Sequence, residues 1–123
     1  MRKPIKYAIY QGLTNYDTVL TDDLDKIKNT SFGEFDLNRF PIVNVAKRVM
    51  KEKGTLGAIF NASNEEAVRA FLNHQIPFLG IEKIINTCLK KQKSVNNPTY
   101  EDLKKADLST RLLVKQMILK GEY

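Results

Sequence analysis

The residues best suited to chemistry lie within the stretch IFNASNEEAVRAFL, which covers residues 59–72. Three of its polar residues are Asn61 and, three and four positions later, Asn64 and Glu65, a spacing that places them on one face of a helix. Carboxylate and amide oxygens bind hard divalent cations, so a metal site is one interpretation of this face. Metal catalysis, however, needs more carboxylate or imidazole ligands than these three residues supply.

Two further interpretations of the same face require no catalysis. In one, the helix begins late, with Ser63 as its N-cap and Glu66 closing a capping box, so that the asparagines belong to the preceding turn. In the other, the helix is continuous, and Asn61, Asn64 and Glu65 dock against another part of the protein. Amides buried in such a contact need hydrogen-bond partners, because each unpaired one would cost about 1–3 kcal/mol.

No other residue pattern points to an active site. The six glycines are scattered and do not form the Gly-x-Gly-x-x-Gly loop of a dinucleotide-binding fold. His74, the only histidine, is expected on a surface turn, and together with the single cysteine, Cys88, it is too little for a structural zinc. The adjacent acids Glu65 and Glu66 point in different directions. We therefore expect no catalytic residue, cofactor-binding residue or metal ligand in this chain.

Helices must position these residues, because apolar residues recur with helical spacing from Pro41 onward. Gly54 is a typical stop for the first helix, and a second is predicted from about Leu56 to Asn73. A third follows Pro77. The inner faces of the first and third helices carry Ile42, Val45, Ala46, Val49, Met50 and Ile81, Ile84, Ile85, Cys88, Leu89.

The wheel of the second helix predicts a core stripe and an exposed stripe on either side of the amide face. The core stripe consists of Leu56, Ile59, Phe60, Ser63, Ala67, Ala70 and Phe71. The exposed stripe consists of Glu66, Arg69 and Asn73.

Two shorter helices are predicted near the carboxyl end. Thr99 and Asp102 form a helix-start pattern of the capping-box type, followed by a short helix through Leu103. Asp107 is predicted to cap a last helix. The inner stripe of that helix is Thr110, Leu113, Val114, Met117 and Ile118.

Residues 1–40 differ from the rest of the chain. Pro4 can open a short helix, and the pieces around residues 19–21 and 31–32 suit either a strand or an extended connection. These pieces have too few apolar neighbours to form a core. The predicted fold is therefore mainly α: a bundle of four to five helices at 41–123, preceded by an irregular connecting arm at 1–40.

Composition and charge narrow the class of protein. A chain of 123 residues with 42% hydrophobic and 28% charged residues is typical of one soluble globular domain. It contains no apolar run long enough for a membrane span, and no hydrophobic run of signal-peptide length follows its basic first residues. Its single cysteine fits a reducing cytoplasm. The formal charge of +6 comes from dispersed lysines without interleaved aromatic residues, so a solvated surface is favoured over nucleic-acid binding.

At NASNEEAVRAFL the sequence resembles the 1-deoxy-D-xylulose 5-phosphate reductoisomerase family, whose carboxyl-terminal region carries a similar Asn-Ala-(Ala/Ser)-Asn-Glu stretch. The start MRKPIKYA is similar to the family's Met-(Arg/Lys)-x-Pro-Ile, and DLNRFP at 36–41 is similar to its Asp-x-x-Arg-(Phe/Tyr)-Pro. Further matches follow in the same order, so that the likeness covers essentially the whole chain: Gly54-Thr55, Ile76-Pro77-Phe78 and Ala106-Asp107 with Arg111.

The resemblance implies that this chain is roughly the last third of an enzyme that converts 1-deoxy-D-xylulose 5-phosphate to 2-C-methyl-D-erythritol 4-phosphate for isoprenoid synthesis. In the family, NADPH and a divalent metal (Mn²⁺ or Mg²⁺) are bound by domains that precede this region, so the chain alone is expected to be inactive. Met1 matches a methionine that borders the substrate and nicotinamide pocket.

The resemblance also implies partners. The bundle would support the missing catalytic domain, with Asn61, Asn64 and Glu65 at or near the contact, and the full-length enzyme would be a homodimer. The alternative is a stand-alone helical module that binds a protein partner through the same surface. An open reading frame that continues upstream of Met1 would favour the enzyme.

Overall fold

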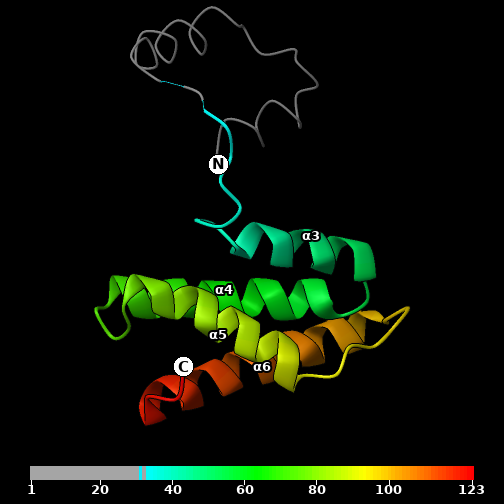
Figure 1. Ribbon diagram of the computed structural model, residues 1–123. Coiled ribbons are helices and arrows are strands. Elements are labelled where there is room, and N and C mark those ends of the chain that lie inside the picture. The colour runs from blue at the N-terminus through cyan, green and yellow to red at the C-terminus, as the bar shows by residue number, and fades with distance from the viewer. Residues whose placement is uncertain (1–30, 32) are drawn as a thin grey trace, which may run out of the picture. The chain divides into compact units, whose positions relative to one another are not determined.

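The computed structural model describes residue 31 and residues 33–123. Asp36–Tyr123 form a compact unit that contains four helices: α3 (Ile42–Glu52), α4 (Leu56–Leu72), α5 (Phe78–Lys91) and α6 (Tyr100–Lys120). Consecutive helices run in opposite directions (Figure 1). No strand occurs among the described residues, and the prediction of a mainly α bundle is confirmed. The short helix predicted from Pro4 lies outside the described residues, and the division at residue 40 stays a prediction.

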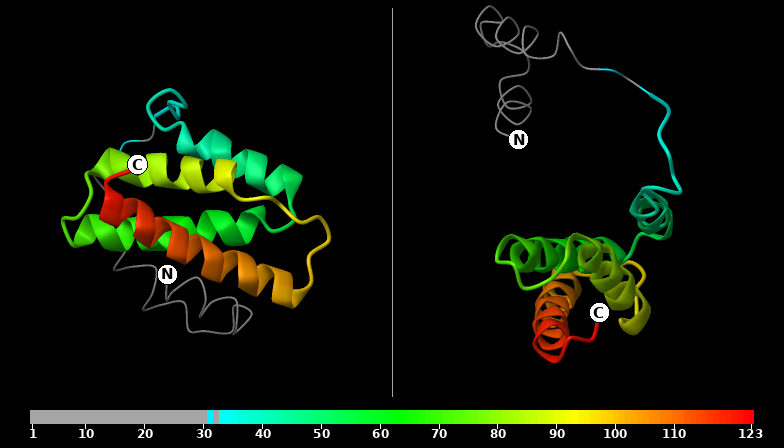
Figure 2. Two further views of the ribbon diagram at one scale, coloured as in Figure 1. Left: turned by 90° about the horizontal axis from the view of Figure 1, so that it is seen from below. Right: turned by 60° about the vertical axis from the view of Figure 1, so that its left-hand side comes forward.

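The central helix of the bundle is α4, which packs against each of the other three helices (Figures 1 and 2). Its inner residues meet apolar residues of α5 and α6 in one core. The largest fully buried apolar side chains are Ile59, Ile84, Ile85, Val114 and Met117. Because burying one such side chain stabilises the fold by about 1.5–3 kcal/mol, the contacts of α4 with α5 and α6 dominate the stability of the bundle.

The second predicted helix is continuous, and the interpretation that it starts at Ser63 is wrong. Its first residue is Leu56, and Ser63 lies in its interior. There the Ser63 hydroxyl donates to the backbone carbonyls of Ile59 (2.8 Å) and Phe60 (3.0 Å) instead of capping a terminus. The prediction that Glu66 is exposed is also wrong, because Glu66 is only 5% exposed.

At the carboxyl end, one long helix replaces the two short ones that were predicted. The capping box is confirmed: Thr99 Oγ1 accepts from the backbone N–H of Asp102 (3.2 Å), and the Asp102 carboxylate accepts from the backbone N–H of Thr99 (2.9 Å). The prediction that Asp107 is an N-cap is wrong. No glycine or proline interrupts residues 100–120, so the helix that begins at Thr99 simply continues through Asp107.

The last residue packs against the start of α5. A Cβ atom built on Gly80 would lie 3.2 Å from Cε2 of Tyr123. Gly80 is itself buried, so a side chain at this position would be in tight contact with the Tyr123 ring at the first turn of α5.

Replacing Thr99 with alanine is expected to destabilise the chain by about 1 kcal/mol, because α6 loses its side-chain N-cap. The free energy of unfolding can be measured by urea denaturation. Thr99→Ser, which keeps the hydroxyl, is the control and should stay within a few tenths of a kcal/mol of the parent. Equal midpoints for Thr99→Ala and Thr99→Ser would show that the cap contributes nothing.

Candidate docking surface

One side of α4 is tied to α6 by a group of charged residues, here called the Arg111 cluster: Arg111, Asp107, Glu65, Glu66 and Arg69. The Arg111 guanidinium donates to Glu65 (2.7 Å), to Glu66 (3.1 Å) and to Asp107 (2.8 Å, from Nε). Arg69 adds a second cation at 3.1 Å from Glu66. The buried Glu66 carboxylate therefore has two partners, which explains how a charge can lie in a position predicted to face solvent.

Glu65 and Asn61 belong to this α6 side of the helix. The Asn61 amide donates to Glu65 at 3.2 Å. Hydrogen bonds from Arg111 and then from Asn61 hold the pKa of Glu65 below its ordinary value of 4.5. The hydrogen bonds that Arg111 donates, first to Asp107 and then to Glu65, raise the pKa of its guanidinium. Two of the three residues predicted to dock are thus already bonded within the chain, although both remain exposed.

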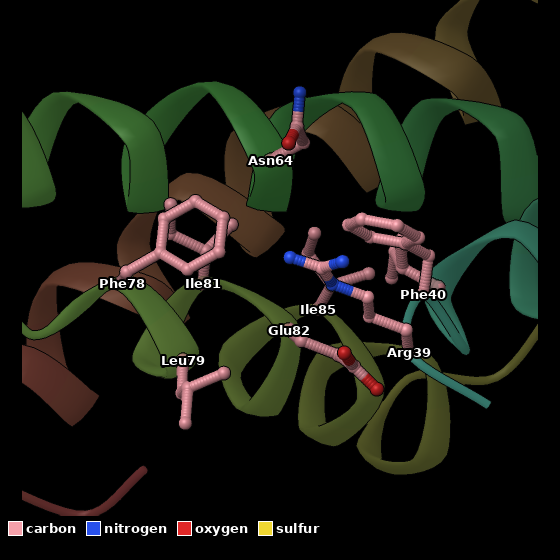
Figure 3. Close-up of a pocket in the computed structure, with 9 residues that line it drawn as sticks. Arg39, Phe40, Asn64, Phe78, Leu79, Ile81, Glu82 and Ile85 are labelled. Atoms are coloured by element: carbon pink, nitrogen blue, oxygen red, sulfur yellow. The ribbon is translucent and has the colours of Figure 1, made fainter. Parts of the chain in front are cut away.

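The third residue, Asn64, faces a different surface. It lines a groove of about 410 Å³ between α4, α5 and the turn before α3 (Figure 3). The residues that line this groove include Arg39, Phe40, Asn64, Phe78, Leu79 and Glu82. Asn64 is half-buried, and its side chain has no hydrogen-bond partner among the described residues.

A turn at Asp36 builds one wall of the groove. The Asp36 carboxylate accepts from the backbone N–H groups of Asn38 (2.8 Å) and Arg39 (3.1 Å), and the Asp36 carbonyl accepts from Phe40 N–H (3.1 Å). This Asx turn sets Arg39 and Phe40 in place just before α3. The Arg39 guanidinium lies 5.5 Å from the centre of the Phe40 ring, a cation–π distance.

The first turn of α5 builds the opposite wall. Phe78 and Leu79 are 66% and 70% exposed, although both are large apolar residues. The Phe78 ring is fixed by an edge-to-face contact with Phe71, at 5.7 Å between ring centres. A hollow with exposed aromatic and aliphatic side chains beside polar ones is typical of an interaction site.

Sequence reasoning missed most of the groove. Arg39, Phe40 and Phe78 occur in stretches used for the family resemblance, but no spacing rule connects residue 39 with residue 78. Met1, predicted at a pocket border, lies outside the described residues. Among the residues that are described, no group of three His, Cys, Asp or Glu side chains could hold a metal ion.

Two further observations complete the chemistry of the described part of the chain. Cys88 is fully buried, and this burial raises the pKa of its thiol to about 11, so little reactive thiolate forms at neutral pH. Over the same residues, the helices are too short or too polar for any of them to span a bilayer.

The family model and the individual proteins that this chain matches all belong to the reductoisomerases of 1-deoxy-D-xylulose 5-phosphate (DXP). The model of the DXP reductoisomerase C-terminal domain family matches residues 1–113. The 1-deoxy-D-xylulose 5-phosphate reductoisomerases of Halalkalibacterium halodurans and Geobacillus kaustophilus are each 34% identical over 119 residues, which is 96% of this chain and 31% of theirs. The enzyme of that name from Clostridium novyi is 34% identical over 115 residues, which is 94% of this chain and 30% of its own.

This chain therefore spans about a third of the length of the curated relatives it matches. The family match extends over nearly all of it, from the first residue into the second half of α6. The chain belongs to the DXP reductoisomerase C-terminal domain family.

Proposed function

We propose that this chain is the carboxyl-terminal structural domain of a reductoisomerase that converts 1-deoxy-D-xylulose 5-phosphate to 2-C-methyl-D-erythritol 4-phosphate with NADPH. The family match over residues 1–113 carries the proposal. The described residues lack a ligand set that fits a divalent metal, so in this proposal the rest of the enzyme holds Mn²⁺ or Mg²⁺ and NADPH. The single, buried cysteine suits a cytoplasmic enzyme.

In this proposal the bundle docks on the catalytic domain and holds it in place, within a homodimeric enzyme. Asn64 is at the centre of the contact, since its amide has no partner within the described bundle. Asn61 and Glu65 are at the edge, because they are exposed but already bonded to each other and, for Glu65, to Arg111. A half-buried amide that has no partner within the described bundle is available to a partner domain, which supports this placement.

A chimaera tests the function. The matched 119 residues of the H. halodurans enzyme are replaced by this chain, and turnover of 1-deoxy-D-xylulose 5-phosphate is followed by NADPH oxidation with Mn²⁺ or Mg²⁺. We expect turnover within about tenfold of the parent, a loss of no more than about 1.4 kcal/mol in transition-state stabilisation. The 123-residue chain alone should show none.

The alternative function, a stand-alone module that binds a protein partner, predicts a different result. A chimaera that unfolds cooperatively and binds NADPH, yet has no turnover, would contradict the proposed function and favour the module. The H. halodurans enzyme without its matched region serves as the control for what the catalytic part does by itself.

Replacing Asn64 with alanine separates docking from internal stability. In the 123-residue chain the free energy of unfolding should change by less than about 0.5 kcal/mol, because no internal bond is lost. In the chimaera the same change should lower the melting temperature by about 2–4 °C, because a buried partner group is left unpaired. Asn44→Ala, at an exposed position of α3, is the matched control. Equal effects of the two variants on the melting temperature of the chimaera would show that Asn64 does not take part in the contact.

A further inference from the structure

Three polar side chains that line the groove have no polar partner among the described residues. Arg39, Asn64 and Glu82 form no hydrogen bond or ion pair through their side chains with any described residue, and Arg39 only stacks on Phe40. Figure 3 shows the Arg39 guanidinium between the rings of Phe78 and Phe40, with Glu82 on α5 on one side and Asn64 on α4 on the other. Across α4, by contrast, Glu65 and the other carboxylates of the Arg111 cluster are all bonded.

The smaller cavity of the bundle, about 200 Å³, supports the same contrast. Except for Lys93 and Lys105, its polar side chains are bonded among the described residues. Ser109, for example, donates to Gln92 (3.1 Å), and Thr55 accepts from the backbone N–H of Val95 (3.0 Å). In the groove, none of the three polar side chains has a polar partner among the described residues, and they lie beside the exposed apolar side chains of Phe78 and Leu79.

The charges of the groove restrict what could fill it. A segment that fills the groove would pair a carboxylate with Arg39 and a cation or an amide donor with Glu82. Between these two groups it would carry an apolar side chain. A second copy of this chain fits poorly, because exposed apolar residues of α6 such as Leu108 and Leu112 are flanked by lysines such as Lys104, which would repel Arg39. The relatives offer another source, since about two thirds of their length lies outside the matched region.

We propose that a segment of the preceding, catalytic part of the same polypeptide fills this groove. It places one aromatic or branched apolar side chain against Phe78 and Leu79, a carboxylate on Arg39 and a donor on Glu82. The volume of about 410 Å³ suits a few side chains of such a segment. This inference rests on the proposed function, because it requires that the chain be joined to a catalytic part.

Thiol labelling can test the inference because the single native cysteine, Cys88, is fully buried and should not react with the reagent. Leu79→Cys places a thiol in the groove, and Leu119→Cys places one on α6 at a position 87% exposed. Each variant is prepared in the 123-residue chain and in the H. halodurans chimaera. Modification by iodoacetamide is quantified for each peptide by mass spectrometry, so that cysteines of the relative do not interfere.

We expect the two thiols to react at similar rates in the 123-residue chain. In the chimaera, the thiol of Leu79→Cys should react at least about tenfold more slowly, as residues at the centre of a contact do, whereas that of Leu119→Cys should not change. Equal reactivity of Leu79→Cys in both proteins would overturn the inference. Protection that is already present in the 123-residue chain would also overturn it, and loss of that protection on dilution would identify a second copy.

A second pair of variants tests the charge requirement. Adding Arg39→Ala to the Leu79→Cys chimaera should restore at least about a third of the lost reactivity, because the partner's carboxylate loses its contact. Arg48→Ala, which removes an exposed arginine of α3 whose ion pair with Glu52 is 3.8 Å long, should restore none. Equal effects of the two changes would overturn the role of Arg39.

The labelling experiment and the turnover experiment can contradict the groove contact and the proposed function separately. A chimaera that is active while the Leu79→Cys thiol stays fully reactive contradicts the groove and leaves the proposed function intact. A protected thiol in an inactive chimaera contradicts the proposed function and leaves the groove contact intact.

Discussion

Replacing Arg111 with methionine is expected to destabilise the chain by about 2–3 kcal/mol, as measured by urea denaturation. The reason is Glu66, whose side chain is 6% exposed and would keep only Arg69 as a partner. Breaking a fully buried ion pair costs about 3–5 kcal/mol, but the Arg111 side chain is 25% exposed, so water lowers the expected loss. Methionine retains the apolar contacts of the arginine stem, which isolates the effect of the charge.

A double variant tests this explanation. Arg111→Met combined with Glu66→Gln should be more stable than Arg111→Met alone, because it removes a buried charge that would otherwise keep only the largely exposed Arg69 as its partner. Arg48→Ala, which removes an exposed ion pair on α3, is the control and should change stability by less than about 0.5 kcal/mol. If the double variant were less stable than the single one, the buried charge would not be the cause.

The same cluster predicts a direction of pH dependence. The pKa of Glu65 lies below its ordinary value of 4.5 in the folded chain, mainly because Arg111 donates a hydrogen bond to it. A lowered pKa means that Glu65 stabilises the fold above pH 4.5 and that this contribution is lost as pH falls through the lowered pKa. Arg111→Met should therefore flatten the decline of the unfolding midpoint on acidification.

Replacing Gly54 with alanine is expected to cost at least about 2 kcal/mol, since a left-handed backbone and a steric clash add together. Gly54 has φ +62°, and a Cβ atom there would lie 2.5 Å from the carbonyl oxygen of Val95 and 2.9 Å from Ser94 Oγ. The loop cannot easily move away, because Val95 is bonded to Thr55 in both directions, at 3.2 Å and 3.0 Å. Urea denaturation measures the loss.

Gly57→Ala is the matched control because Gly57 lies only three positions away, inside α4, with no atom within 4 Å of a built Cβ. Alanine should stabilise the chain there by about 0.5–1 kcal/mol, since glycine is a poor helix former. Opposite signs for the two glycines are the expected result. A shift of the same sign at both would mean that the contact with Val95 is not rigid.

Much of the fold was predictable because it depends on local pattern. The spacing of Ile81, Ile84, Ile85 and Cys88 defines the buried face of α5, and Thr99 with Asp102 defines the start of α6. The predictions were wrong where a contact between residues far apart in the sequence determines whether a side chain is buried. Glu66 lies on a stripe that looks exposed on a helical wheel, but its partner Arg111 is 45 positions away. A helical wheel of α4 contains no information about an ion pair with another helix.

The candidate site was less predictable for the same reason. Asn64 was singled out because an amide is unusual on that helix face, and the docking role given to it stays a prediction. Arg39 and Leu79 carried no such signal, because a single arginine or leucine is ordinary in its own segment. Only the packing of three segments around one hollow makes them notable.

The contact between Tyr123 and Gly80 has a practical consequence. Any affinity tag or fluorescent protein fused after Tyr123 would emerge next to the first turn of α5, one residue from Leu79. Such a fusion would crowd the hollow and could imitate a bound partner in a labelling assay. Variants for that assay should therefore be purified without an appended sequence at this end.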